Sequence, residues 1–155
     1  HENVRVALQS KAGVTHSFWQ SNRQLSVFDE RAEELLESVG LSGAAHVAAV
    51  ELPYGRKRAL ELATTLALEP QVLLLDEPMA GMGREDIART TALIRSVSRT
   101  RTVVMVEHNL SVVADLSDII TVLRRGEVLA EGRYSEVSAN PEVQKAYTGG
   151  GNHAH

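Results

Sequence analysis

The segment VLLLDEPMAG, residues Val72 to Gly81, decides the fold. An aliphatic run is followed at once by two carboxylates, Asp76 and Glu77, and then by Pro78. A short, continuous apolar run that follows a helix-breaking residue is typical of a strand covered on both faces in a parallel sheet. Carboxylates add little to such packing. We therefore interpret the strand as the support that carries Asp76 and Glu77 to its carboxyl end.

The segments around this strand alternate between helical and extended patterns. Before it, apolar residues recur at helical spacing in 28–41 and 55–69. In the first of these helices, acidic residues are expected to fill the first turns and Gly40 to supply the stop, and Pro70 is expected to end the second helix. After it, the predicted order is a helix over 84–99, a strand over 102–108, a short helix over 109–117, strands over 118–123 and within 124–132, and a short helix from 140. Strands and helices that alternate at these lengths indicate an α/β fold with a mostly parallel sheet flanked by helices.

Composition excludes several classes of protein. The chain has 155 residues, enough for a hydrophobic core, and it has no cysteine for a disulfide framework or a Cys-based zinc site. It carries 16 basic and 20 acidic residues, which argues against nucleic-acid binding driven by bulk charge. No apolar run approaches the roughly 18 residues that would span a bilayer. We expect a soluble, intracellular protein.

The strand ends gather groups suited to phosphoryl chemistry. In an open parallel sheet, ligands bind at the carboxyl ends of the strands, where Asp76, Glu77 and His108 are all expected. A carboxylate at a strand end can hold Mg²⁺ through water, and a neighbouring carboxylate can polarise an attacking water as a general base. The histidine could hold that water or a terminal phosphate. Together these groups suit phosphoryl transfer to water, although a solvated strand edge and a surface histidine are the plainer alternatives.

In this order, the motifs resemble the ATP-binding subunits of ABC transporters. VLLLDEP is similar to their Walker B strand with its catalytic glutamate, His108 to their switch histidine, and residues 80–83, AGMG, lie where they have a D-loop. LPYGRKRALELATTLALEP, residues 52–70, lies where the family has its signature motif and signature helix. LPYG, EPMAGM, VEHNL and the ending EGRYSEVSANPEVQKAYTG are most similar to branched-chain amino acid importers.

The resemblance implies a fold and a division of the chain. It implies the carboxyl-terminal part of a P-loop NTPase domain of the ABC type. Residues 1–69 would be a helical subdomain with the signature segment, 70–148 the Walker B and switch-histidine part of the ATPase core, and 149–155 a flexible tail. The His153 and His155 pair in that tail could bind a metal, but a frayed end is the simpler interpretation.

The resemblance also implies roles. Glu77 and His108 would be catalytic, and Asp76 would hold Mg²⁺ through water. The signature segment Tyr54–Arg56 consists of Tyr54, Gly55 and Arg56. It would face the γ-phosphate of ATP held by a partner subunit, because a glycine lets the backbone approach a phosphate closely. The implied partners are a second ATP-binding subunit and membrane permease subunits, without nucleic acid, and the implied location is the cytoplasmic face of the cell membrane.

Two motifs depart from the family pattern. Pro53 stands where the signature motif usually has serine, so no hydroxyl contact can be expected there, and Tyr54 stands in place of a glycine. The D-loop usually ends in leucine and aspartate rather than in the Met-Gly of this chain, so no specific contact is assigned to Gly83.

The phosphate-binding loop GxxxxGK[ST] is missing from the sequence. We therefore expect the chain to be the carboxyl-terminal part of a longer subunit, and to bind ATP poorly and hydrolyse it negligibly by itself. One alternative is a non-catalytic module that dimerises and contacts a membrane partner. Another is an ABC-type ATPase of DNA repair, but the chain has neither a sustained heptad pattern nor a basic surface signature.

Overall fold

The computed structural model describes residues 1–13 and 22–148, which form two compact units, His1–Val106 and Glu107–His155. The expected tail over 149–155 lies outside the described residues. The division at residues 69 and 70 rests on motifs and stays a prediction.

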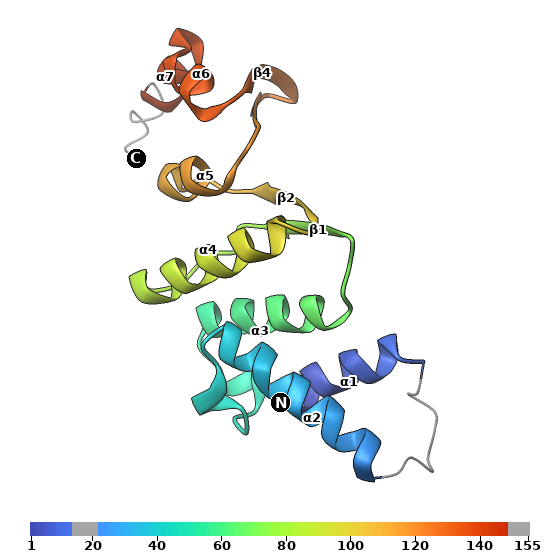
Figure 1. The fold of residues 1–155 in the computed structure, drawn as a ribbon. Helices are drawn as coiled ribbons and strands as arrows, with labels where there is room; N and C mark the ends of the chain where they lie inside the picture. Colours follow the sequence, from blue (N-terminus) through green and yellow to red (C-terminus); the bar gives the residue numbers. More distant parts are fainter. Residues whose placement is uncertain (14–21, 149–155) are drawn as a thin grey trace. The chain divides into compact units, whose positions relative to one another are not determined.

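The amino-terminal half of the first unit is helical. Helices α1, α2 and α3 pack against one another in pairs (Figure 1). Their bounds, with those of two short 3-10 helices between α2 and α3, are α1 Glu2–Lys11, α2 Asn22–Ser38, η1 Ser42–Ala44, η2 Ala49–Glu51 and α3 Tyr54–Ala67. Both apolar stripes expected from the sequence are buried: Ala32, Leu35, Leu36 and Val39 on α2, and Ala59, Leu62, Ala63 and Leu66 on α3.

The start of α2 differs from the expectation. The helix begins at Asn22, before the predicted start at Phe28, and its first turn contains no acidic residue. The expected pairing of acidic side chains with the positive end of the helix dipole was therefore wrong, since those side chains lie further along the helix. Its predicted stop is confirmed, because Gly40 has a φ of 74° just after Ser38.

A parallel pair of strands completes the first unit. Strand β1, Val72–Asp76, pairs in parallel with β2, Thr102–Val106, and α4, Arg84–Ser98, connects them and packs on β2. The register sets Leu74 opposite Val104 and Asp76 opposite Val106. This βαβ arrangement is the one predicted from the sequence.

Only one face of this pair is covered in the first unit. Leu73 is 1% exposed, whereas Leu74 is 77% exposed and Val106 is 62% exposed. The expectation of a strand covered on both faces was wrong for the described residues. Since successive side chains of a strand point to opposite faces, burial of Leu73 leaves its neighbours Val72 and Leu74 on the other face.

The second unit contains the remaining elements. A short helix, an antiparallel hairpin and two further helices follow one another: α5 Leu110–Leu116, β3 Ile120–Arg124, β4 Glu127–Gly132, α6 Tyr134–Ala139 and α7 Pro141–Thr148. The turn between the strands, Arg125–Gly126, has φ values of 53° and 84°, as in the tight turns that match the twist of a hairpin. Helices α6 and α7 pack on the hairpin, with Val137 and Val143 buried.

Each unit contributes one pair of described strands. One sheet is the parallel pair β1–β2, and the other is the antiparallel pair β3–β4. The two-residue turn at Arg125–Gly126 is the reason for the second arrangement, because so short a connection can join only antiparallel neighbours.

The alternation along β1 gives a first prediction. In the 155-residue chain, Leu73→Ala should lower the free energy of unfolding by about 2–5 kcal/mol, because it leaves a cavity under the strand. The control, Leu74→Ala, removes the same atoms from an exposed position and should cost less than about 1 kcal/mol. Urea denaturation followed by circular dichroism measures both. Equal losses would show that the two faces of β1 are equally covered.

Candidate active site

The carboxylate pair lies where β1 ends. Asp76 is the last residue of the strand, and Glu77 follows it; both are exposed. The Glu77 N–H donates to the Val106 carbonyl oxygen at 2.9 Å, so the pairing with β2 continues one residue beyond β1. Glu77 has a φ of 44°, a left-handed conformation that costs free energy for a residue other than glycine. The backbone is thus bent and fixed at the residue expected to act as the base.

A compact turn follows Glu77. The Ala80 N–H donates to the Glu77 carbonyl oxygen at 3.0 Å, and the Met82 N–H donates to the Met79 carbonyl oxygen at 3.2 Å. Met79 is 5% exposed, and Pro78 is buried too. The segment Glu77–Met82, hereafter the Glu77 turn, is therefore anchored in the core instead of forming a loose loop.

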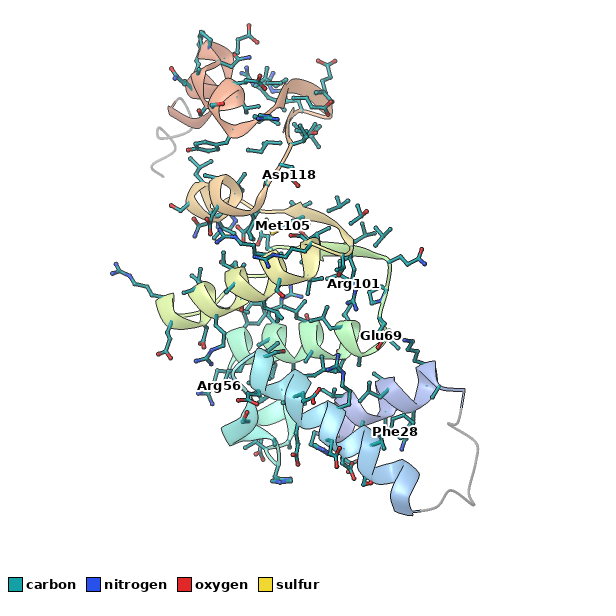
Figure 2. All side chains as sticks on the ribbon, viewed as in Figure 1. Phe28, Arg56, Glu69, Arg101, Met105 and Asp118 are labelled. Carbon is teal, nitrogen blue, oxygen red and sulfur yellow. The ribbon has the colours of Figure 1, made fainter. Side chains whose placement is uncertain are left out.

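The signature segment Tyr54–Arg56 opens α3, as predicted within one residue. Pro53 precedes the helix with φ −55° and ψ 154°, and the Lys57 N–H donates to its carbonyl oxygen at 3.0 Å. Among the described residues, no side chain caps this helix. The N–H groups of Tyr54–Arg56 precede the first bond within the helix, so they form the positive end of its dipole. Figure 2 labels Arg56, which is exposed, in this first turn.

Tyr54 is held by side chains of the same helix. Its hydroxyl accepts hydrogen bonds from Arg58 Nε and Nη2 at 3.2 and 3.0 Å, and the guanidinium carbon of Arg58 lies 5.4 Å from the centre of its ring. Arg58 Nη1 also donates to Glu61 Oε2 at 2.7 Å. The hydrogen bonds to Glu61 and Tyr54 raise the pKa of the Arg58 guanidinium. Arg58 is thus a fixed cation beside the ring of Tyr54, a role that the sequence alone did not suggest.

His108 lies in the second unit, two residues after β2, and its side chain is 75% exposed. Asp76 and Glu77 are adjacent in the first unit, and His108 belongs to the second.

Glu107 was missed by the sequence analysis. Its side chain is 2% exposed, and its Oε2 accepts hydrogen bonds from the N–H groups of His108 and Asn109 at 2.8 and 3.0 Å. Oε2 also lies 3.8 Å from His108 Nδ1. The Asn109 side chain in turn caps α5 by accepting from the N–H groups of Ser111 and Val112. A charged residue directly before a candidate histidine was the available signal, because an acceptor there can fix the backbone of the next residues.

These bonds give a second prediction. Glu107→Ala should lower the free energy of unfolding by about 1–2 kcal/mol, because two backbone donors lose a charged acceptor. Glu107→Gln retains one carbonyl oxygen and should lose less. Thermal denaturation of the chain and the amide chemical shifts of His108 and Asn109 report the change. Unchanged shifts in Glu107→Ala would contradict this role for the carboxylate.

The carboxylates suit part of a magnesium site. Within residues 1–13 and 22–148, no group of three or more His, Cys, Asp or Glu side chains is placed to hold a metal ion. Asp76 and Glu77 still offer hard oxygen donors at an exposed strand end, and Mg²⁺ usually keeps several waters and takes one or two carboxylates. These residues therefore fit Mg²⁺ only as a partial ligand set.

Two family models match this chain. A family model described as "ABC transporter" matches residues 1–80, just over half of the chain. The chain belongs to the ABC transporter family. A second family model, described as "Branched-chain amino acid ATP-binding cassette transporter", matches residues 127–153 of the chain. The family predicted from the motifs is thus confirmed.

Curated relatives of the chain support the same family. The chain is 36% identical over 151 residues to the high-affinity branched-chain amino acid transport ATP-binding protein BraF of Pseudomonas aeruginosa, and 34% identical over 151 residues to LivG of Escherichia coli strain K12, which has the same description. Each match covers 96% of this chain and 58% of the relative. The chain thus spans less than two thirds of the length of these relatives.

Solved structures confirm the predicted fold class. The ADP conformation of MJ1267, an ATP-binding cassette of an ABC transporter, matches with a TM-score of 0.68 at 22% identity, over 95% of this chain and 62% of that one. The dimeric post-hydrolysis state of the cassette MJ0796 matches with a TM-score of 0.71 at 24% identity, over 86% of this chain and 55% of that one.

In the described part of this chain, no helix has both the length and the apolar character needed to cross a bilayer.

Proposed function

We propose that this chain supplies the signature segment and the hydrolytic groups of an ATP-binding subunit of an ABC importer for branched-chain amino acids. The observation that carries the proposal is the strand end itself: β1 delivers two exposed carboxylates on a fixed backbone, in a chain matched by both family models. The names of BraF and LivG support the substrate class.

Each group takes a separate role in the hydrolysis of ATP. Asp76 holds Mg²⁺ through water, and the ion neutralises charge on the phosphates when bound. Glu77 accepts a proton from the attacking water, and its exposed position leaves room for that water. His108 holds the water or the γ-phosphate by a hydrogen bond. The N–H groups that open α3 attract the phosphates of ATP held by a partner subunit.

The need for a partner subunit follows from which ATP-binding groups this chain contains. The sequence contains no GxxxxGK[ST] loop, so the chain brings the signature segment but not the backbone cradle for phosphates. We propose that the whole subunit works as a dimer on membrane permease subunits at the cytoplasmic face, where ATP is present. The dimeric state of MJ0796 supports the dimer.

The third prediction tests Glu77. In the full-length subunit, Glu77→Gln should reduce kcat for ATP by roughly 10²–10⁴-fold, because a neutral amide cannot accept the proton. The dissociation constant for ATP should change little, since the substitution preserves size and backbone. Steady-state phosphate release and equilibrium nucleotide binding measure the two quantities. A parallel loss of binding and turnover would assign Glu77 a structural role instead.

The fourth prediction concerns the 155-residue chain by itself. Without a phosphate cradle it should show negligible ATP hydrolysis and weak ATP binding. Phosphate release and isothermal titration with Mg²⁺-ATP check this, with Glu77→Gln as the control for contaminating ATPases. Turnover that disappears in Glu77→Gln would overturn the expectation.

The missing loop also keeps a second candidate open, a module that dimerises and contacts a membrane partner without turnover. The coding region upstream of His1 distinguishes the two candidates. A phosphate loop there favours the ATPase, and a coding region without one favours the module.

A further inference from the structure

Two glycines bring the signature segment and the Glu77 turn into backbone contact. A Cβ added to Gly55 would lie 2.5 Å from the Gly81 carbonyl oxygen, 2.9 Å from its carbonyl carbon and 3.1 Å from Met82 Cα. All three are backbone atoms, which cannot swing aside as the end of a side chain can. Gly55 is buried. The glycine at position 55 is therefore required by packing within the chain, whether or not a phosphate approaches it.

The contact is reciprocal. Gly81 has a φ of 72°, and a Cβ added to it would lie 2.6 Å from Tyr54 Cδ1. The Tyr54 ring therefore lies over Gly81, and the two hydrogen bonds from Arg58 hold the ring there. The first turn of α3 thus touches the Glu77 turn twice, through the backbone at Gly55 and through the ring of Tyr54.

Two hydrogen bonds between described residues also attach the Glu77 turn to neighbouring elements. One is the bond from the Glu77 N–H to the Val106 carbonyl oxygen, which ties its beginning to β2. The other lies near its end, where Thr90 Oγ1 donates to Met82 Sδ at 3.4 Å. Thr90 is 2% exposed and belongs to α4. Helix α3 is thus a further support of the turn, and it also presents the signature-segment N–H groups.

We propose that Gly55 and Tyr54 are positioning residues for Glu77: their contact with Gly81 makes the first turn of α3 and the Glu77 turn one rigid joint. A displacement of the amino terminus of α3 then shifts the backbone that carries the Glu77 carboxylate. The joint is a property of this chain, and its consequence for hydrolysis rests on the proposed function.

Amide hydrogen exchange of the 155-residue chain, followed by NMR without nucleotide, tests the joint. Gly55→Ala forces backbone apart, so the amides of Ala80 and Met82 should exchange about tenfold faster or more. The matched control is Gly83→Ala, at a glycine two residues after Gly81, where an added Cβ would meet no described atom within 4 Å. It should leave both amides within about twofold of the wild-type rate.

A second variant keeps the test decisive if Gly55→Ala does not fold. Tyr54 is 56% exposed, so Tyr54→Ala removes the ring from Gly81 with little loss of core packing. The amides of Ala80 and Met82 should again exchange faster, while the amides of α2 keep their protection. Unchanged exchange at Ala80 and Met82 in Tyr54→Ala, at unaltered global stability, overturns the joint.

The kinetic arm uses the full-length subunit. If Gly55 positions Glu77, Gly55→Ala should lower kcat about tenfold or more and leave KM for ATP within about twofold. A loss confined to KM would mean that Gly55 serves nucleotide binding only, and it would overturn the positioning role. If the wild-type subunit shows no turnover, the proposed function fails, and the exchange measurements still decide whether the joint exists.

Discussion

The parallel backbone pairing of β1 with β2 is the constraint on which the candidate site depends. Asp76 lies opposite Val106, and the Glu77 N–H adds one more bond to the same residue. Because these are main-chain bonds, the strand register, and not side-chain packing, sets the position of the two carboxylates along the strand direction. Burial of Leu73 on one face then fixes which side chains point away from the core.

Backbone contacts also explain why this chain tolerates its unusual signature segment. Pro53 already has the extended geometry that precedes a helix, so the loss of a capping hydroxyl does not prevent α3 from starting. Tyr54 replaces a usual glycine, and its ring lies over Gly81, held by Arg58. At Gly55 main chain meets main chain, so an added Cβ would force the backbone to shift.

Periodicity and motif order predicted much of the fold. The stripe that buries Leu62 and Leu66 and the apolar run before Asp76 are local patterns, and both formed the predicted elements. The exposure of Leu74 was not predictable, because it depends on which elements cover the sheet. The antiparallel hairpin required attention to the two-residue turn Arg125–Gly126.

The candidate site was predicted less completely than the fold. Asp76 and Glu77 stand out in the sequence because carboxylates end an apolar run. Contacts between residues far apart in the chain leave no such pattern, so the pairing of Gly55 with Gly81 needed three-dimensional structure. Glu107 looked like one more charged residue until its burial and its two backbone bonds were visible.

The left-handed backbone at Glu77 has a consequence for how this position can evolve. Because φ at residue 77 is 44°, a side chain at this position must suit a left-handed backbone as well as the chemistry of the site. Glycine, asparagine and aspartate adopt this region most easily, whereas β-branched residues are strongly disfavoured there. A saturation library at residue 77 would therefore rank variants on two independent scales, one for foldability and one for proton transfer. Glutamate would be retained only where selection for the carboxylate outweighs the conformational preference for asparagine or glycine.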